Sequence, residues 1–498
     1  MKKYLIQISG LGNLEFTLPV LTGRKSEILS KILFSLGIVS FFLLIAVLPY
    51  SNLFSGKSFE QSSFETLILF MCTTLAFLGS FLLLQGKKVL VDPKYFLSVL
   101  LFALLTTAAS VLKSPAHISN TFGIELVRSL SGVTIMSIVG FYFFFNLVAK
   151  DFKTLNKLVN TFKFSLVVLI IILMFHTNVT DVNFVNNNLA IVLFAYFFLT
   201  LSLVFTRTKL VLKSILLAVS AIFVFLTPQA IPSSIISTQV ITAGAVSLII
   251  LGVLYLSLKK QYVRSKLSQL SSVREGFKEK KYSLSEVSYF LLLSVSVIAI
   301  LVGVLVHFKF NFSFDVLLNP LNSLINDVKA TFAGTLNFQA LAIGSGSFDT
   351  VKRISNLDSF LSSVVNVFVT QGLIGLTAYV FILVTSLMAL FKSIKKSLSS
   401  RSNRGFVFLM SFTIVFVAIY SFFSYGGELL TILFWFAFAT LGVYLNLKSL
   451  KDEYMQKDWN VQPIFIKGKL GVYLRILLSV LIILISILAV IAFSKISV

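Results

Sequence analysis

Charged residues are scarce in this chain, and this argues against a water-soluble protein. Only 12% of the 498 residues are Asp, Glu, Lys or Arg, while 57% are hydrophobic; soluble domains carry roughly 25% charged residues. The formal charge of +23 would suit a nucleic-acid partner if the basic residues shared one soluble face. Here they form short clusters between long apolar runs, which is typical of a polytopic membrane protein and predicts no nucleic-acid partner.

Residues and motifs for several kinds of chemistry are also missing. The single cysteine, Cys72, has no second cysteine for an intrachain disulfide, and three histidines make a zinc centre improbable. There is no GxxxxGK[ST], HExxH or CxxC motif, and no GxSxG at a strand–helix junction. Ionisable residues are almost absent from the middle of the apolar runs, which disfavours an ion-coupled transporter. We therefore expect no metal and no cofactor.

The apolar runs predict the fold class. A helix needs roughly 20 mostly apolar residues to cross the hydrocarbon core, so the chain reads as an all-α integral membrane protein with about 12–13 transmembrane helices. The run 360–371 is also fairly apolar, so the helix predicted after it is expected to begin earlier or to follow a helix at the membrane interface. The candidate spans are residues 31–49, 64–85, 95–112, 132–149, 162–176, 189–206, 210–227, 239–258, 286–307, 372–391, 405–424, 429–446 and 471–494.

These spans divide the chain into four parts: a cytoplasmic N-terminal segment at 1–30, the first nine spans at 31–307, a large extracytoplasmic loop at 308–371, and the last four spans at 372–498. With the N-terminus inside, most of the 42 basic residues fall in cytoplasmic segments, as the positive-inside rule requires. The first apolar run begins too far from Met1 for a cleavable signal peptide. The expected location is therefore the plasma (inner) membrane, with several spans and a cytoplasmic N-terminus.

Cations are few on the predicted outer side, where Arg128 and Arg353 are the two arginines. Arginine suits bidentate capture of phosphate, so these two, with Lys352 beside the second, lead the candidates for binding a phosphorylated substrate. Purely structural roles remain open, because Arg128 can pair with Glu125 on one helix face and Arg353 can snorkel at the interface. Glu428, also at an outer helix end, joins the candidates for substrate binding.

A second polar cluster, TNVTDVNFVNNNLA at 177–190, runs into a predicted helix. Asn187 and Asn188 can cap that helix, and its N-terminus would then offer backbone donors to an anionic oxygen. Capping alone explains these asparagines as well as ligand binding does, so both interpretations stay open.

Three stretches of the chain together resemble one family, the O-antigen ligases and bacterial polysaccharide polymerases. FVNNNLAIVL at 184–193 resembles that family's Asn-Pro-Asn-x-Leu-Ala helix opening, without the proline. The largest outer loop lies between the ninth and tenth spans, as in the family. LAIGSGSFDT at 341–350 and QGLIGLTAYVFIL at 371–383 resemble the family's pairing of a Gly-x-Gly-x-x-x-Phe turn with a Gly-Leu-Ile-Gly-Leu helix start.

The resemblance implies glycosyl transfer at the outer face: a glycan leaves an undecaprenyl-diphosphate carrier for a hydroxyl on a second glycan or glycolipid. Membrane lipids, the lipid-linked donor and the acceptor would be the partners. The family's usual histidine is missing from SNLDSFLSSVVNVFVTQG at 355–372, and its arginine from LTPQAIPSSIISTQVITAG at 226–244. Asp358 or His176 is then the candidate catalytic base. A flippase for lipid-linked oligosaccharides and an inactive structural envelope protein remain as alternatives, so enzymatic activity itself is left open.

The predicted orientation can be tested by cysteine labelling from outside the cell, in a background without Cys72. A cysteine at Leu270 should stay unlabelled, and one at Thr335 should react with a membrane-impermeant reagent, because basic loops are retained in the cytoplasm. The reverse pattern would overturn the topology together with every outer-side residue proposed from it.

Overall fold

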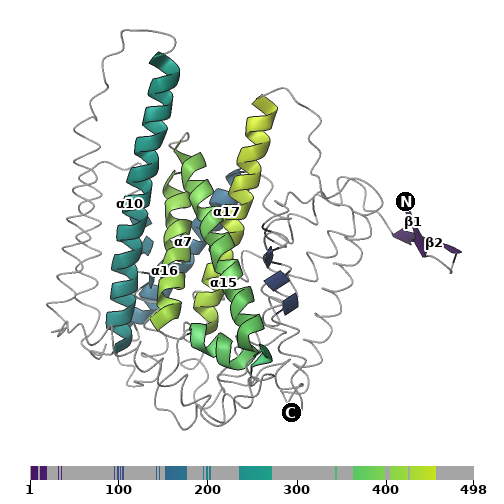
Figure 1. Ribbon diagram of the computed structural model, residues 1–498, viewed down its shortest axis with the longest axis horizontal. Coiled ribbons are helices and arrows are strands. Elements are labelled where there is room, and N and C mark those ends of the chain that lie inside the picture. The colour runs from purple at the N-terminus through teal and green to yellow at the C-terminus, as the bar shows by residue number, and fades with distance from the viewer. Residues whose placement is uncertain are drawn as a thin grey trace.

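The computed structural model describes residues 2–8, 12–18, 152–175, 235–271, 342–344, 363–398, 404–423 and 427–455, with isolated helical positions among 28–35, 95–105, 142–145 and 194–202. It contains five long helices within these residues (Figure 1). They are α7 (Phe152–Phe175), α10 (Ile235–Ser271), α15 (Ser363–Ser397), α16 (Arg404–Phe423) and α17 (Gly427–Met455).

Three of these helices are long and apolar enough to cross a membrane, over Thr242–Val263, Gln371–Ser397 and Arg404–Phe422. The five helices coincide with the spans predicted at 162–176, 239–258, 372–391, 405–424 and 429–446. The prediction of a helical membrane protein is confirmed at this level. The total number of spans, the loop 308–371 as a whole and the side of each terminus remain predictions.

The N-terminal segment departs from the all-α prediction. β1 (Lys2–Ile8) and β2 (Gly12–Leu18) pair antiparallel, with Tyr4 opposite Phe16 and Ile6 opposite Leu14. Apolar residues at every second position, with aromatic and β-branched types among them, give this stretch the period of a strand. Figure 1 shows the hairpin apart from the helices, and every other element that the structure describes is helical.

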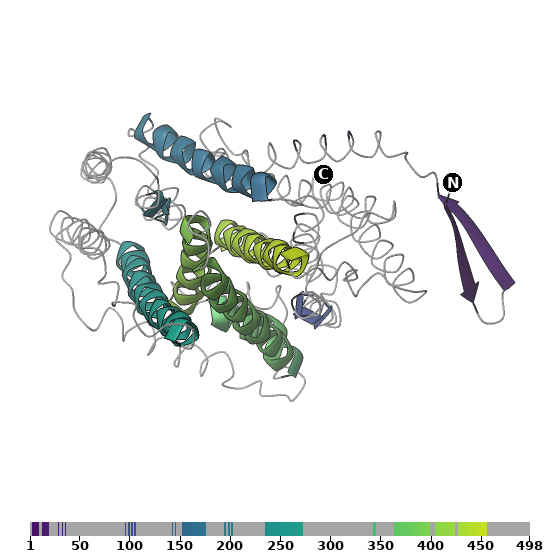
Figure 2. The same cartoon turned by 90° about the horizontal axis from the view of Figure 1, so that it is seen from above.

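Helix α16 is the centre of the bundle. It packs against α10, α15 and α17 (Figure 2), and residues such as Val407, Phe412 and Phe416 are fully buried. A helix that is apolar on every side has no solvated face and is stable only when other helices or lipid surround it. This explains why α16, the most uniformly apolar of the helices, lies inside the bundle.

Aromatic side chains of α17 pack against segments far away in the sequence. The run Phe434-Trp435-Phe436-Ala437-Phe438 is buried throughout. On one side, Trp435 lies 5.5 Å from Phe102, and Phe438 lies 5.4 Å from Tyr142 between ring centroids. On the opposite side, Phe436 lies 5.4 Å from Phe145. Consecutive helical residues point in different directions, so one short run holds several neighbouring segments.

The core continues from Phe436 through α7 towards α16. The rings of Phe436 and Phe162 are 5.0 Å apart, and Phe162 and Phe198 meet edge to face at 4.8 Å. Phe194 then contacts Phe416 of α16 at 5.1 Å. Edge-to-face and tilted pairs at these separations are the favourable geometries for aromatic rings.

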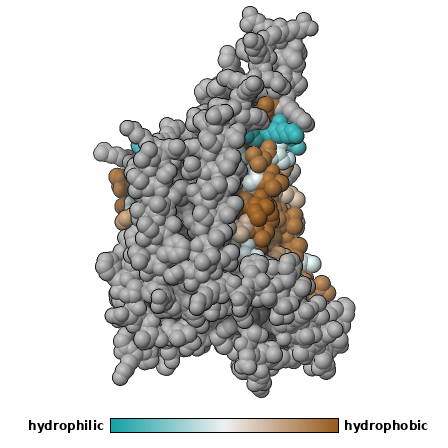
Figure 3. Space-filling model, turned by 90° about the vertical axis from the view of Figure 1, so that its left-hand side faces the viewer, coloured by the Kyte–Doolittle hydropathy of each residue, from teal (hydrophilic) through white to brown (hydrophobic). Residues whose placement is uncertain are grey.

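Large apolar side chains stay exposed on α10 and α15. Ile249 and Val253 of α10 are 65% and 63% exposed, and Met388 of α15 is 54% exposed. Figure 3 shows this surface as an apolar band at its right-hand edge, with hydrophilic residues above it. Contiguous exposed patches of this kind are rare on soluble proteins. On helices that can cross a membrane, such a surface faces lipid.

Basic residues of all five helices gather at one end of the bundle, which we call the basic end. Ring contacts place them there: Phe152 beside Tyr444 at 6.1 Å, and Tyr255 beside Phe408 at 6.5 Å. The residues near these contacts and at the end of α15 are Lys153, Lys157, Lys259, Lys260, Lys392, Lys395, Lys396, Arg404 and Lys448. The positive-inside rule predicts that this end is cytoplasmic.

Replacing Phe436 by alanine should destabilise the bundle strongly. Its ring is fully buried between Phe145 and Phe162, and truncating a buried phenylalanine costs about 3–5 kcal/mol. The thermal midpoint of the protein in detergent, followed by circular dichroism, should fall clearly. Phe381→Ala is the control, because Phe381 is 45% exposed on α15. An equal fall in both variants would contradict the packing described here.

Candidate functional site

Two glycine-containing stretches meet at the end of the bundle opposite the basic end. A Cβ atom added at Gly372 would lie 2.5 Å from the carbonyl carbon and oxygen of Ala342 and 2.5 Å from the nitrogen of Gly344. No side chain fits between these backbones. The structure therefore brings together the Gly-x-Gly turn and the Gly-Leu-Ile-Gly-Leu helix start, which the sequence separates by nearly thirty residues. We call this contact the glycine crossing.

Both glycines adopt backbone conformations that other residues avoid. Gly344 has φ of 85°, and Gly372 has φ of 65° with ψ of −161°. The region around Gly372 is essentially restricted to glycine. Glycine at these positions therefore serves both the close approach and the turn of the chain.

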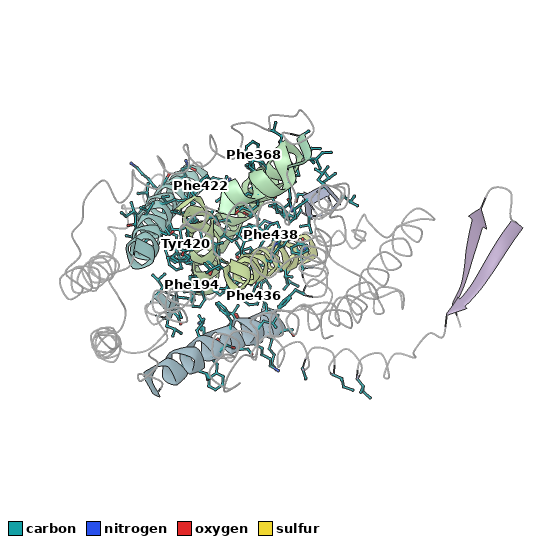
Figure 4. All side chains as sticks on the ribbon, turned by 90° about the horizontal axis from the view of Figure 1, so that it is seen from below. Phe194, Phe368, Tyr420, Phe422, Phe436 and Phe438 are labelled. Atoms are coloured by element: carbon teal, nitrogen blue, oxygen red, sulfur yellow. The ribbon has the colours of Figure 1, made fainter. Side chains whose placement is uncertain are left out.

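Gly372 also breaks α15 into two segments. The chain is helical before and after Gly372 but not at that residue, and Figure 1 shows the first segment turned away from the axis of the second. The expectation that the span at 372–391 follows another helix is confirmed. Seen from below, Phe368 of this first segment and Phe422 of α16 both lie at the end of the bundle that carries the glycine crossing (Figure 4).

Gln371 occupies the corner between the two segments. It is 2% exposed, and a Cβ atom at Gly375 would lie 2.7 Å from its Oε1 atom. Gly375 thus leaves the room that the Gln371 side chain fills. The sequence analysis assigned Gln371 no role, although an amide directly before a glycine in an otherwise apolar run was a signal that could have been used.

A second polar contact lies just inside this end. The Tyr379 hydroxyl hydrogen-bonds to Ser421, and Ser421 Oγ donates to the carbonyl oxygen of Val417 at 2.7 Å. This pair ties α15 to the last turn of α16, so the second segment of α15 has a fixed position next to the glycine crossing.

Most of the predicted site residues lie outside the described residues, so whether they converge is not decided. These are Arg128, His176, Asn187, Asn188, Lys352, Arg353 and Asp358. Glu428 is placed by its backbone as the second residue of α17, where a carboxylate favours the positive end of the helix dipole. Among the described residues, no group of three or more His, Cys, Asp or Glu side chains could hold a metal ion.

Comparisons with protein-family models and with curated proteins find no match to this chain. The likeness to O-antigen ligases and polymerases therefore stands on the short stretches quoted above.

Gly372→Ala should destabilise the protein, because the new methyl group meets backbone atoms of Ala342 and Gly344 and the φ angle is unfavourable. Gly252→Ala is the matched control: it also lies within an apolar helix, but nothing lies within 4 Å of its added Cβ. That variant should be neutral or stabilised by roughly 0.5–1 kcal/mol. Thermal midpoints of both variants in detergent test the crossing, and an unchanged Gly372→Ala protein would refute it.

Proposed function

We propose that this chain is a membrane glycosyltransferase of the O-antigen ligase or polymerase type, acting on lipid-diphosphate-linked glycans at the outer membrane face. One observation carries the proposal: the glycine crossing joins Gly344 and Gly372, from the two stretches that resemble the paired motifs of that family. Short motifs that match by chance have no reason to lie in backbone contact.

The proposed reaction needs little apparatus. The bond between the anomeric carbon of the donor glycan and the carrier diphosphate breaks, and a bond from that carbon to the acceptor hydroxyl oxygen forms. Asp358 or His176 takes the hydroxyl proton as general base. Arg353 and Arg128, assisted by Lys352, bind the diphosphate and stabilise the charge that it gains on leaving. Asn187, Asn188 and Glu428 would contact the glycan.

The runner-up functions make different demands on the helices. A flippase needs a cationic, hydrated cavity deep in the bundle. Between Gln371 and Phe391, and between Gly405 and Phe423, α15 and α16 contain no charged residue, which favours chemistry at one end of the bundle over passage through these two helices. A structural envelope protein would require no convergence of the outer polar groups.

Arg353→Ala should lose roughly 1.5–3 kcal/mol of donor binding, the usual range for a hydrogen bond to a charged group. Arg353→Lys should recover only part of this loss, because a lysine ammonium lacks the two parallel donors of a guanidinium. Binding of an undecaprenyl-diphosphate-linked glycan and its transfer to an acceptor would both be measured in proteoliposomes.

The matched control is Lys329→Ala, which removes one positive charge from the same predicted loop without touching the Lys352–Arg353 pair. Its donor affinity and transfer rate should stay near those of the unaltered protein. Unchanged transfer by Arg353→Ala would remove the mechanism proposed for the diphosphate. Donor movement across the bilayer without transfer would favour the flippase instead.

A further inference from the structure

The last part of α15 carries an exposed apolar stripe that ends in lysines. Val384, Met388 and Phe391 are 41%, 54% and 43% exposed, and Lys392 and Lys395 follow them, also exposed. Met388 lies four residues before Lys392, and Phe391 lies four residues before Lys395. Residues three or four apart share one face of a helix. The two lysines therefore stand side by side above the stripe, at the basic end.

Lys392 is held in place by a neighbouring segment. Its Nζ atom lies 5.5 Å from the centroid of the Tyr95 ring, and this ring is only 3% exposed. A cation over the face of an aromatic ring is attracted by the ring's negative face. The contact fixes the direction of a side chain that is otherwise flexible, while the residue remains exposed.

No carboxylate on the surrounding helices offsets these charges. The sequences of α7, α10, α15 and α16 contain no Asp or Glu. Lys259 and Lys260 of α10 and Arg404 of α16 add positive charge to the same end. At a membrane surface, clustered basic side chains attract anionic lipid headgroups.

We propose that Lys392 and Lys395 form a binding site for one anionic phospholipid. Its phosphate lies between the two ammonium groups, and its acyl chains lie along Val384, Met388 and Phe391. The apolar stripe directly below the cations identifies a membrane lipid as the ligand, since a soluble anion would use the lysines alone. This site lies at the basic end and is independent of the glycosyltransferase proposal.

The test uses the full-length protein in a neutral detergent, titrated with dioleoylphosphatidylglycerol or dioleoylphosphatidylcholine, with bound lipid counted by native mass spectrometry. The unaltered protein should retain the anionic lipid in preference to the zwitterionic one. The double variant Lys392→Gln/Lys395→Gln should bind phosphatidylglycerol roughly 30-fold more weakly, from the loss of two cations near a headgroup. Its thermal midpoint should stay unchanged, because both lysines are exposed.

The matched control is Lys153→Gln/Lys157→Gln on α7. These two lysines are exposed at the same end, but the exposed residues beside them are Asn156 and Asn160 and not an apolar stripe. The control should bind phosphatidylglycerol as the unaltered protein does. Equal weakening in both double variants would reduce the effect to net charge and overturn the site.

Two further outcomes would also overturn the proposal. One is equal retention of both lipids by the unaltered protein. The other is full displacement of phosphatidylglycerol by inorganic phosphate at millimolar concentration, which would identify a site for soluble anions. Weak competition by phosphate, together with loss of binding in the Lys392/Lys395 variant alone, is the result expected for a lipid site.

Discussion

The packing of aromatic rings around α17 is the interaction on which the rest of the bundle depends. Within five residues, α17 places Trp435 and Phe438 against the segments that carry Phe102 and Tyr142, and Phe436 against Phe145 and Phe162. In a membrane, helix association gains little from the hydrophobic effect, because lipid is as apolar as the side chains. Close contact between large, rigid rings supplies van der Waals attraction and fixes the position of each helix.

Buried hydroxyl groups fit into this apolar core because several of them bond within their own helix. Ser386 donates to Leu383, Thr413 to Leu409 and Thr440 to Phe436, each to a backbone carbonyl oxygen three or four residues earlier. These polar groups are satisfied without a partner on another helix. The hydrogen bond between Tyr379 and Ser421 differs in joining α15 to α16, and it lies near the glycine crossing, where a fixed geometry matters most.

The two ends of the bundle have different chemistry. The basic end combines lysines, an aromatic ring and an exposed apolar stripe, which suits contact with anionic lipid. The opposite end has the glycine crossing, the buried Gln371 and the bend in α15. At that end the backbone approaches itself too closely for side chains to intervene. The proposed enzyme would use this rigid corner to position the loops that bear its charged residues.

The sequence by itself determined the membrane class and the position of five helices, because an apolar run of sufficient length has few stable alternatives in lipid. It also supplied the two glycine stretches, but not their contact, since spacing along the chain does not specify which backbones meet. The N-terminal hairpin was missed, although its apolar alternation was visible between Lys2 and Leu18. Only the tertiary structure decided the bend at Gly372, the burial of Gln371 and the cation–π contact of Lys392 with Tyr95. These features come from packing between segments distant in sequence, and local pattern carries no information about such packing.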